Sequence, residues 1–293
     1  MTSSEVRTLK QAPSMLPMFA KALIRANVKP GANPTLPNIA VRLTDVMLDS
    51  KHLAAYRRVC GFSAKGVLPI TYPHMHAHPL FMTLLLDKHF PFAVLGLVHV
   101  RNIITQHRPI KEREQLDIEC RFGELKRLPK GYEFSIITSV TTGGELVWES
   151  ESIMFRRGGG TGETTERKPR EGSPIPSVYE TWYVKEDLGR RYGAISGDRN
   201  PIHLYAFTAK MFGFKRPIAH GMWSKARSLA SLEDQLPTSP FTVDVSFKLP
   251  MFIPAKVLFA PEKTEDGFRF RLLAKDGVKP HLEGTIKPAE EDN

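Results

Sequence analysis

The chain has 293 residues and a net charge of +10, with 41% hydrophobic and 25% charged residues. This composition is typical of a soluble globular protein of two domains, and no stretch has the roughly 18 consecutive apolar residues of a membrane span. The two cysteines, Cys60 and Cys120, are too few for a disulfide framework or a structural zinc site. We therefore expect no membrane partner, no metal and no cofactor.

The basic residues are spread along the chain without a block interleaved with aromatics, which argues against a nucleic-acid partner. The basic surface is then either simply solvated or attracts an anionic substrate. The N-terminus has no basic segment followed by a compact apolar run, so it does not resemble a secretory signal. We expect a cytoplasmic protein.

The first half of the chain predicts a helix within residues 72–89, followed by β-segments over 96–110, 131–140 and 146–155. The β-segments are predicted from β-forming residues and from alternation between turns. A glycine-, proline- and charge-rich stretch then interrupts the pattern, as a mobile linker does. We assign residues 1–157 to one domain, 158–176 to the linker and 177–293 to a second domain.

The second half repeats this order. A helix is predicted over 222–236 because apolar residues recur at steps of three and four, with Ser224, Lys225 and Ser231 on the opposite, polar face. β-segments follow over 241–253, 267–275 and 281–288.

The two predicted helices match in a faint internal duplication, in which Ala77–Leu80 falls on Ala219–Met222. One helix wrapped by an antiparallel sheet is the simplest assembly for each half, and two such units would pack side by side as a pseudo-dimer. The predicted fold class is α+β.

The stretch RYGAISGDRNPIHLYAFTAKMFGFKRPIAHGM, residues 191–222, carries the candidate site. The turn formers around Asp198 have local reasons to be there, and a single histidine such as His203 is more often structural than catalytic. The combination argues otherwise, because a carboxylate and an imidazole stand on either side of a proline-stiffened bend and His220-Gly221 follows at a helix start. Together these residues form a candidate active site.

The chemistry of such a site follows from its groups. Unpaired N–H groups at a helix N-terminus stabilise negative charge on an oxygen, and Gly221 has no side chain to keep a ligand away. A thioester carbonyl bound there would be polarised toward an enolate. Asp198 and His203 could hold one water over the adjacent double bond and move its protons. Addition or removal of water then needs no metal.

At these residues the sequence resembles the MaoC-like, (R)-specific enoyl-CoA hydratases and 3-hydroxyacyl dehydratases, a family with the hotdog fold. The family pattern, roughly Y-x-x-x-S-G-D-x-N-P-I-H and then P-I-x-H-G, is met by Tyr192, Ser196, Gly197, Asp198, Asn200, Pro201, Ile202, His203, Pro217, Ile218, His220 and Gly221. The resemblance covers residues 176–288 and implies a double-hotdog fold for the whole chain.

The resemblance also implies roles for individual residues. Asp198 and His203 would be the catalytic pair, Asn200 would orient the loop or the water, and the Gly221 amide would be the oxyanion donor. The substrate-binding candidates are Ser196, Gly197, Ile218, His220 and Met222. The substrate would be a coenzyme A or acyl-carrier-protein thioester, and two chains could pair further as a homodimer.

The duplication predicts that the first half is catalytically silent. In the predicted register the counterpart of Gly221 is Pro79, which has no N–H to donate. The counterpart of the catalytic loop falls around residues 56–66, which contain neither aspartate nor histidine. The first half would then serve to build the acyl pocket.

Three alternatives remain open at this point. An acyl-CoA thioesterase is the rival enzyme, since one fold hosts several chemistries, and a non-catalytic acyl-thioester-binding protein is the rival from another class. The third is a divalent metal site at His74, His76 and His78, which on a strand would share one face. The duplication instead places these histidines at a helix start, where they would diverge.

Overall fold

The computed structural model describes residues 5–162, 179–238 and 240–289, which fall into two compact units. Of the described residues, the first unit comprises 5–47, 76–102 and 114–162, and the second comprises 48–75, 103–113, 179–238 and 240–289. The segments 48–75 and 103–113 therefore pack with the second half of the chain. The division at 157 and 177 stays a prediction, and most of the predicted linker lies outside the described residues.

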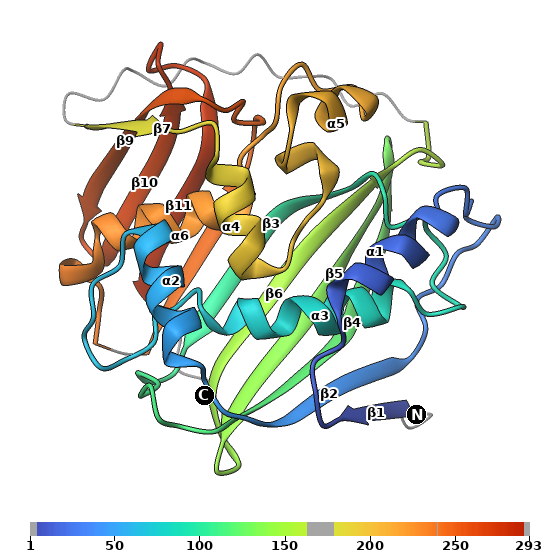
Figure 1. Cartoon of the computed structure of the whole chain (residues 1–293), viewed down its shortest axis with the longest axis horizontal. Helices are drawn as coiled ribbons and strands as arrows, with labels where there is room; N and C mark the ends of the chain where they lie inside the picture. The colour runs from blue at the N-terminus through green and yellow to red at the C-terminus, as the bar shows by residue number, and fades with distance from the viewer. Residues whose placement is uncertain (1–4, 163–178, 239, 290–293) are drawn as a thin grey trace. The chain divides into compact units, whose positions relative to one another are not determined.

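The first unit is a sheet in the order β1-β2-β4-β5-β6, with α3 (Pro73–Leu85) lying across it (Figure 1). Its strands are β1 (Glu5–Leu9), β2 (Ile39–Val46), β4 (Leu116–Leu128), β5 (Gly131–Thr142) and β6 (Glu145–Arg157). The pairing is antiparallel as predicted, except that β1 runs parallel to β2. Alternate residues of β4 and β5 face the core, where the rings of Phe90, Phe122 and Phe134 contact one another.

The second unit is an antiparallel sheet in the order β8-β11-β10-β9-β7. Its strands are β7 (Glu180–Val184), β8 (Phe241–Phe247), β9 (Ala255–Thr264), β10 (Gly267–Ala274) and β11 (Pro280–Pro288). Helix α6 (Gly221–Ser231) lies against β10 and β11 (Figure 1), and α2 (Ser50–Cys60) packs on α6 and on α4 (Leu188–Ser196). The strand β3 (Leu97–Gln106) has residues in both units.

Helix α6 is shorter and more deeply buried than its spacing predicts. It ends at Ser231, and a 3-10 turn over Glu233–Gln235 replaces its last predicted residues. The prediction that Ser224 and Lys225 lie on an outer polar face is wrong, because α2 packs on α6 as well as the sheet and both side chains are buried. The Lys225 ammonium donates to the Val243 carbonyl at 3.1 Å, and burial lowers its pKa well below the ordinary value.

The start of α3 corrects the register of the duplication. Helix α3 begins at Pro73, so His78 and Pro79 lie inside it rather than at its start. Aligning the two helices on their first residues pairs Pro73 with Gly221 of α6. Pro73 has no N–H either, so the predicted absence of an amide donor from the first half stays a prediction, now made for Pro73 rather than Pro79.

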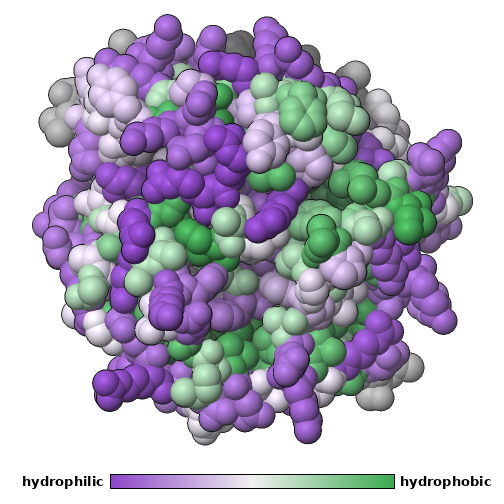
Figure 2. Space-filling model, viewed as in Figure 1, coloured by the Kyte–Doolittle hydropathy of each residue, from purple (hydrophilic) through white to green (hydrophobic). Residues whose placement is uncertain are grey.

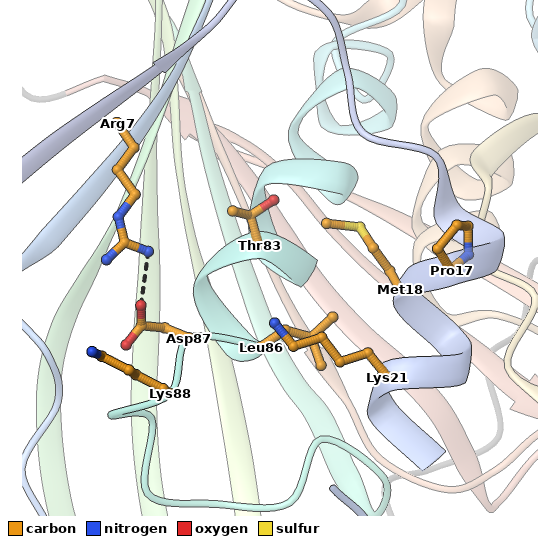
Figure 3. A pocket seen from close by; sticks show the side chains of 8 residues that line it. All are labelled: Arg7, Pro17, Met18, Lys21, Thr83, Leu86, Asp87 and Lys88. Carbon is orange, nitrogen blue, oxygen red and sulfur yellow. Dashed lines mark hydrogen bonds and ion pairs between the residues drawn. The ribbon is translucent and has the colours of Figure 1, made fainter. Parts of the chain in front are cut away.

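Two further observations bear on what the chain binds. No helix in the described part of the chain is long and apolar enough to cross a membrane. A cavity of about 490 Å³ lies in the first unit beside α1 (Met15–Ile24) and the end of α3 (Figure 3). Its only carboxylate, Asp87, is paired with Arg7 at 2.7 Å, and no histidine lines it, so it lacks the groups for acid–base chemistry.

Candidate active site

The loop that carries Asp198 and His203 directly follows helix α4. The helix ends at Ser196, and its C-cap Gly197 has a φ of 72°, a left-handed conformation that glycine adopts without strain. Two glycines on α4 let the loop lie directly on the helix. A Cβ at Gly193 would lie 2.8 Å from the Asp198 carbonyl oxygen, and one at Gly189 would collide with the His203 carbonyl oxygen. The G-x-x-x-G spacing of Gly189 and Gly193 is the sequence signal of this close approach between helix and loop.

The loop is shaped by short hydrogen bonds within it. The Ser196 hydroxyl accepts from the Asp198 amide at 3.2 Å, and the Asp198 carboxylate accepts from the Asn200 amide at 3.1 Å. The Asn200 side chain caps the 3-10 turn Pro201–His203 by accepting from the Ile202 amide. Of the two roles expected for Asn200, this contact supports orientation of the loop.

His203 is buried, and one of its ring nitrogens is committed to the backbone. Nδ1 lies 2.7 Å from the Ile218 carbonyl oxygen, and because a carbonyl only accepts, Nδ1 carries the proton and Nε2 the lone pair. Desolvation lowers the pKa of His203, while the charge of Asp198 and the bond to Ile218 act in the opposite direction. The ring is therefore a neutral base at ordinary pH.

The Ile218 carbonyl is itself fixed by neighbouring backbone. The Ile218 amide donates to the Ile202 carbonyl at 3.1 Å, and the Ala219 amide donates to Met251 at 2.9 Å. Ile218 thus acts on the site through its carbonyl, and its side chain is buried.

His220 supports both members of the predicted pair. Its ring stacks on His203 with centroids 3.7 Å apart, and its Nε2 donates to the Asp198 backbone carbonyl at 3.0 Å. The same nitrogen lies 3.8 Å from an Asp198 carboxylate oxygen. The His220 ring also contacts Tyr192, with centroids 5.0 Å apart, and Tyr192 is buried as well. These contacts hold His220 against Asp198 and His203, whereas the sequence suggested a contact with substrate.

Gly221 is the first residue of α6, directly after His220. The N–H groups of the first helical turn have no acceptor within their own helix, and the described residues offer no acceptor to that of Gly221. A Cβ at Gly221 would lie 3.0 Å from the Phe247 ring, so the position has little room for a side chain. The helix start is anchored by Trp223, whose indole donates to the Val59 carbonyl at 2.9 Å. Met222 is buried beside it.

The side chains of Asp198, His203 and His220 have possible ligand atoms within 4.8 Å of one another, a grouping of metal-ligating types that no other part of the described chain repeats. Two of their ring nitrogens, Nδ1 of His203 and Nε2 of His220, already bond to backbone carbonyls. The set fits proton transfer better than ion binding. His74, His76 and His78 lie two residues apart on α3, and because each helical residue turns by about 100°, neighbouring members of this set point about 200° apart.

Comparison with known proteins identifies the family. The family described as MaoC like domain matches residues 162–279. Over 278 residues the chain is 30% identical to 3-hydroxyacyl-thioester dehydratase X of Mycobacterium tuberculosis, covering 92% of this chain and 98% of that one. The chain belongs to the MaoC-like dehydratase family.

This MaoC-like dehydratase is also similar to a solved structure and to a second characterised enzyme. The crystal structure of HtdX of Mycobacterium tuberculosis superposes with a TM-score of 0.75 at 29% identity, covering 85% of this chain and 100% of that chain. The (R)-specific enoyl-CoA hydratase of Aeromonas caviae is 35% identical over 91 residues, which are 27% of this chain and 68% of the relative. The predicted hotdog-type α+β fold and the predicted family are therefore confirmed.

Proposed function

We propose that this MaoC-like dehydratase is a hydro-lyase that interconverts trans-2-enoyl and (R)-3-hydroxyacyl thioesters. The observation that carries the proposal is the neutral, buried His203 beside the Asp198 carboxylate, next to a helix start whose first amide has no intrahelical acceptor. Its substrates are thioesters of coenzyme A or of an acyl carrier protein. The names of the relatives, a 3-hydroxyacyl-thioester dehydratase and an enoyl-CoA hydratase, support the same reaction class.

Hydration begins when the thioester carbonyl oxygen accepts a hydrogen bond from the Gly221 amide. The positive end of the α6 dipole favours negative charge on that oxygen. A water held between Asp198 and His203 gives a proton to Nε2 of His203, and its hydroxyl adds to C3. The electron pair of the double bond moves toward the carbonyl, which becomes an enolate. The proton then passes from the Asp198/His203 pair to C2, so the enzyme ends as it began.

Dehydration uses the same groups in reverse. The pair takes the C2 proton while the carbonyl oxygen is held at Gly221, and the protonated member of the pair gives its proton to the departing C3 hydroxyl. The low pKa of His203 keeps the ring neutral before the reaction, and Asp198 stabilises the imidazolium that forms.

The test follows two products from one substrate. Loss of the ultraviolet absorbance of crotonyl-CoA with the thioester intact shows hydration, whereas release of free thiol shows a thioesterase. We expect hydration by the wild type and a loss of at least about 10² in rate for Asp198→Asn and for His203→Ala. Binding without turnover of crotonyl- or octenoyl-CoA would favour the acyl-binding protein instead.

Matched controls are available in the same unit. His281 has a lowered pKa and an Nδ1 on the Leu249 carbonyl at 3.0 Å, as His203 has on Ile218, but it lies outside the site. Asp276 accepts from the Val278 amide in a turn. His281→Ala and Asp276→Asn should keep wild-type rates, which separates loss of the chemistry of the site from loss of a similar side chain–backbone hydrogen bond elsewhere in the unit.

We also infer that the first half of the chain carries no second site. Helix α3 begins with Pro73, and the segment 56–66 contains neither aspartate nor histidine. The family match over residues 162–279 includes the candidate site and supports its place in the second half.

A further inference from the structure

The segment that follows His203 exposes an unusual number of apolar side chains. Within eight residues, Tyr205, Phe207, Met211 and Phe212 are all exposed, with Phe207 at 66% and Met211 at 79%. Single exposed apolar residues are ordinary on protein surfaces, but a group of them marks an interaction site. We call residues 205–216, which comprise α5 (Ala206–Met211) and the turn after it, the α5 surface.

The α5 surface is firmly attached to the candidate active site. The Thr208 hydroxyl donates to the Pro201 carbonyl at 2.7 Å, and Ala209 of α5 is fully buried. The Arg190 guanidinium donates to the Leu204 carbonyl at 3.2 Å and lies 5.1 Å from the centre of the Tyr205 ring. A partner bound to this surface would therefore be held in a fixed position relative to His203.

The α5 surface is also basic, and among the described residues its cations have no acidic partner. No aspartate or glutamate occurs between Asp198 and Glu233. Lys210, Lys215 and Arg216 are exposed, and none of them forms an ion pair with a described residue. Exposed apolar side chains and exposed cations thus lie together next to the candidate site in the sequence. Figure 2 shows hydrophobic surface at the position of α5, bordered by hydrophilic residues.

We propose that the α5 surface docks an acidic acyl carrier protein that delivers the substrate, an inference that rests on the proposed function. Phe207 and Met211 stand one helical turn apart and share a face of α5, so together they offer an apolar strip to a partner element. Aromatic residues, methionine and arginine are the types enriched at protein interfaces. The three cations complement an acidic partner and speed its encounter.

Other occupants fit these observations less well. A second copy of this chain would place like charges opposite each other across a two-fold axis, which is repulsive. Coenzyme A alone needs cations for its phosphates but leaves the apolar strip uncovered. An anionic membrane shares the required chemistry and is distinguished by the experiment.

The experiment compares the same crotonyl group on three carriers: an acidic acyl carrier protein, coenzyme A and N-acetylcysteamine. The variants are Lys210→Glu/Lys215→Glu/Arg216→Glu and Phe207→Ser/Met211→Ser. We expect each to lower kcat/KM for the carrier-protein thioester at least tenfold, mainly through KM, and to leave the N-acetylcysteamine thioester unchanged. The charge effect should shrink as salt is raised. The control Tyr183→Ser/Lys256→Glu changes an exposed aromatic and lysine pair on β7 and β9 and should change nothing.

Three results would overturn the proposal. An equal fall in kcat/KM for all three thioesters would show that the α5 surface supports the active site itself rather than docking of the carrier. Loss on coenzyme A alone would make it a phosphate site. Sedimentation with phosphatidylglycerol vesicles, abolished by the same variants while the carrier-protein rate stays normal, would make it a membrane contact. Failure to hydrate even the N-acetylcysteamine thioester would instead contradict the proposed function.

Discussion

The starts of α3 and α6 differ in the groups that each can offer to a ligand. Helix α6 begins with Gly221, which has an N–H and no side chain, whereas α3 begins with Pro73, which has no N–H. His220 precedes α6 and contacts Asp198 and His203, the proposed catalytic pair. Tyr72 precedes α3 and is buried, with its hydroxyl 2.8 Å from the His52 ring. In the proposed reaction this difference leaves an amide donor at the start of α6 and none at the start of α3.

The segments before the two helices differ in the same way. In the second half, the loop on α4 holds Asp198 and His203 by contacts to Gly189 and Gly193. In the first half, residues 56–66 contain the end of α2 and the turn after it, with Cys60 buried. Burial raises the pKa of that thiol, so it stays protonated and packs as an apolar group. The loop on α4 carries the proposed proton-transfer groups, whereas residues 56–66 contain no aspartate or histidine.

The largest effect should come from giving α6 the first residue of α3. Gly221→Pro removes the proposed oxyanion donor, and we expect kcat on crotonyl-CoA to fall about 10²-fold or more. The reciprocal change, Pro73→Gly, should leave the rate unchanged. A normal rate for Gly221→Pro, with unaltered circular dichroism, would show that the carbonyl is held elsewhere.

A smaller effect is expected at the two glycines of α4. Gly193→Ala forces the Asp198 backbone away by a few tenths of an ångström or more, and we expect a cost of about 1–3 kcal/mol in the free energy of unfolding. Gly189→Ala should cost more, because its contact with the His203 carbonyl is closer. Gly31→Ala is the control, since nothing lies near its Cβ position. Urea unfolding measures the difference, and equal midpoints for all three would refute the packing argument.

The smallest effect concerns how the hydration rate depends on pH below neutrality. Because burial lowers the pKa of His203, its base form persists below the pH at which an ordinary histidine is protonated. The rate should therefore be flat near neutral pH and fall only below the ordinary histidine pKa of 6.5. Asp198→Asn removes the charge that raises this pKa, so in that variant an NMR titration of His203 should move to lower pH. A shift to higher pH would contradict the electrostatic picture.

The sequence was most informative where the signal is local. The apolar spacing after Gly221 predicted α6, the alternation Val243–Phe247 predicted β8, and the motif predicted the family that the comparisons confirm. The reaction class is likewise confirmed, whereas the roles of the individual site residues stay predictions. The motif also named Asp198 and His203, which the structure brings together with His220.

What the sequence could not predict depends on contacts between distant segments. The burial of Lys225 follows from α2 packing on α6, which no periodicity within α6 reveals. The tautomer of His203 follows from the Ile218 carbonyl, and that of His220 from the Asp198 carbonyl. The true start of α3 at Pro73 was missed because the duplication was aligned on His78 and His220 rather than on helix starts.

The central claim is that the chain has one active site, in its second half. The most direct test is the residual hydration of crotonyl-CoA by the double variant Asp198→Asn/His203→Ala, checked for native folding by circular dichroism. We predict a rate indistinguishable from the uncatalysed reaction. A folded double variant that keeps a substantial fraction of the wild-type rate would contradict the claim and direct attention to the first half.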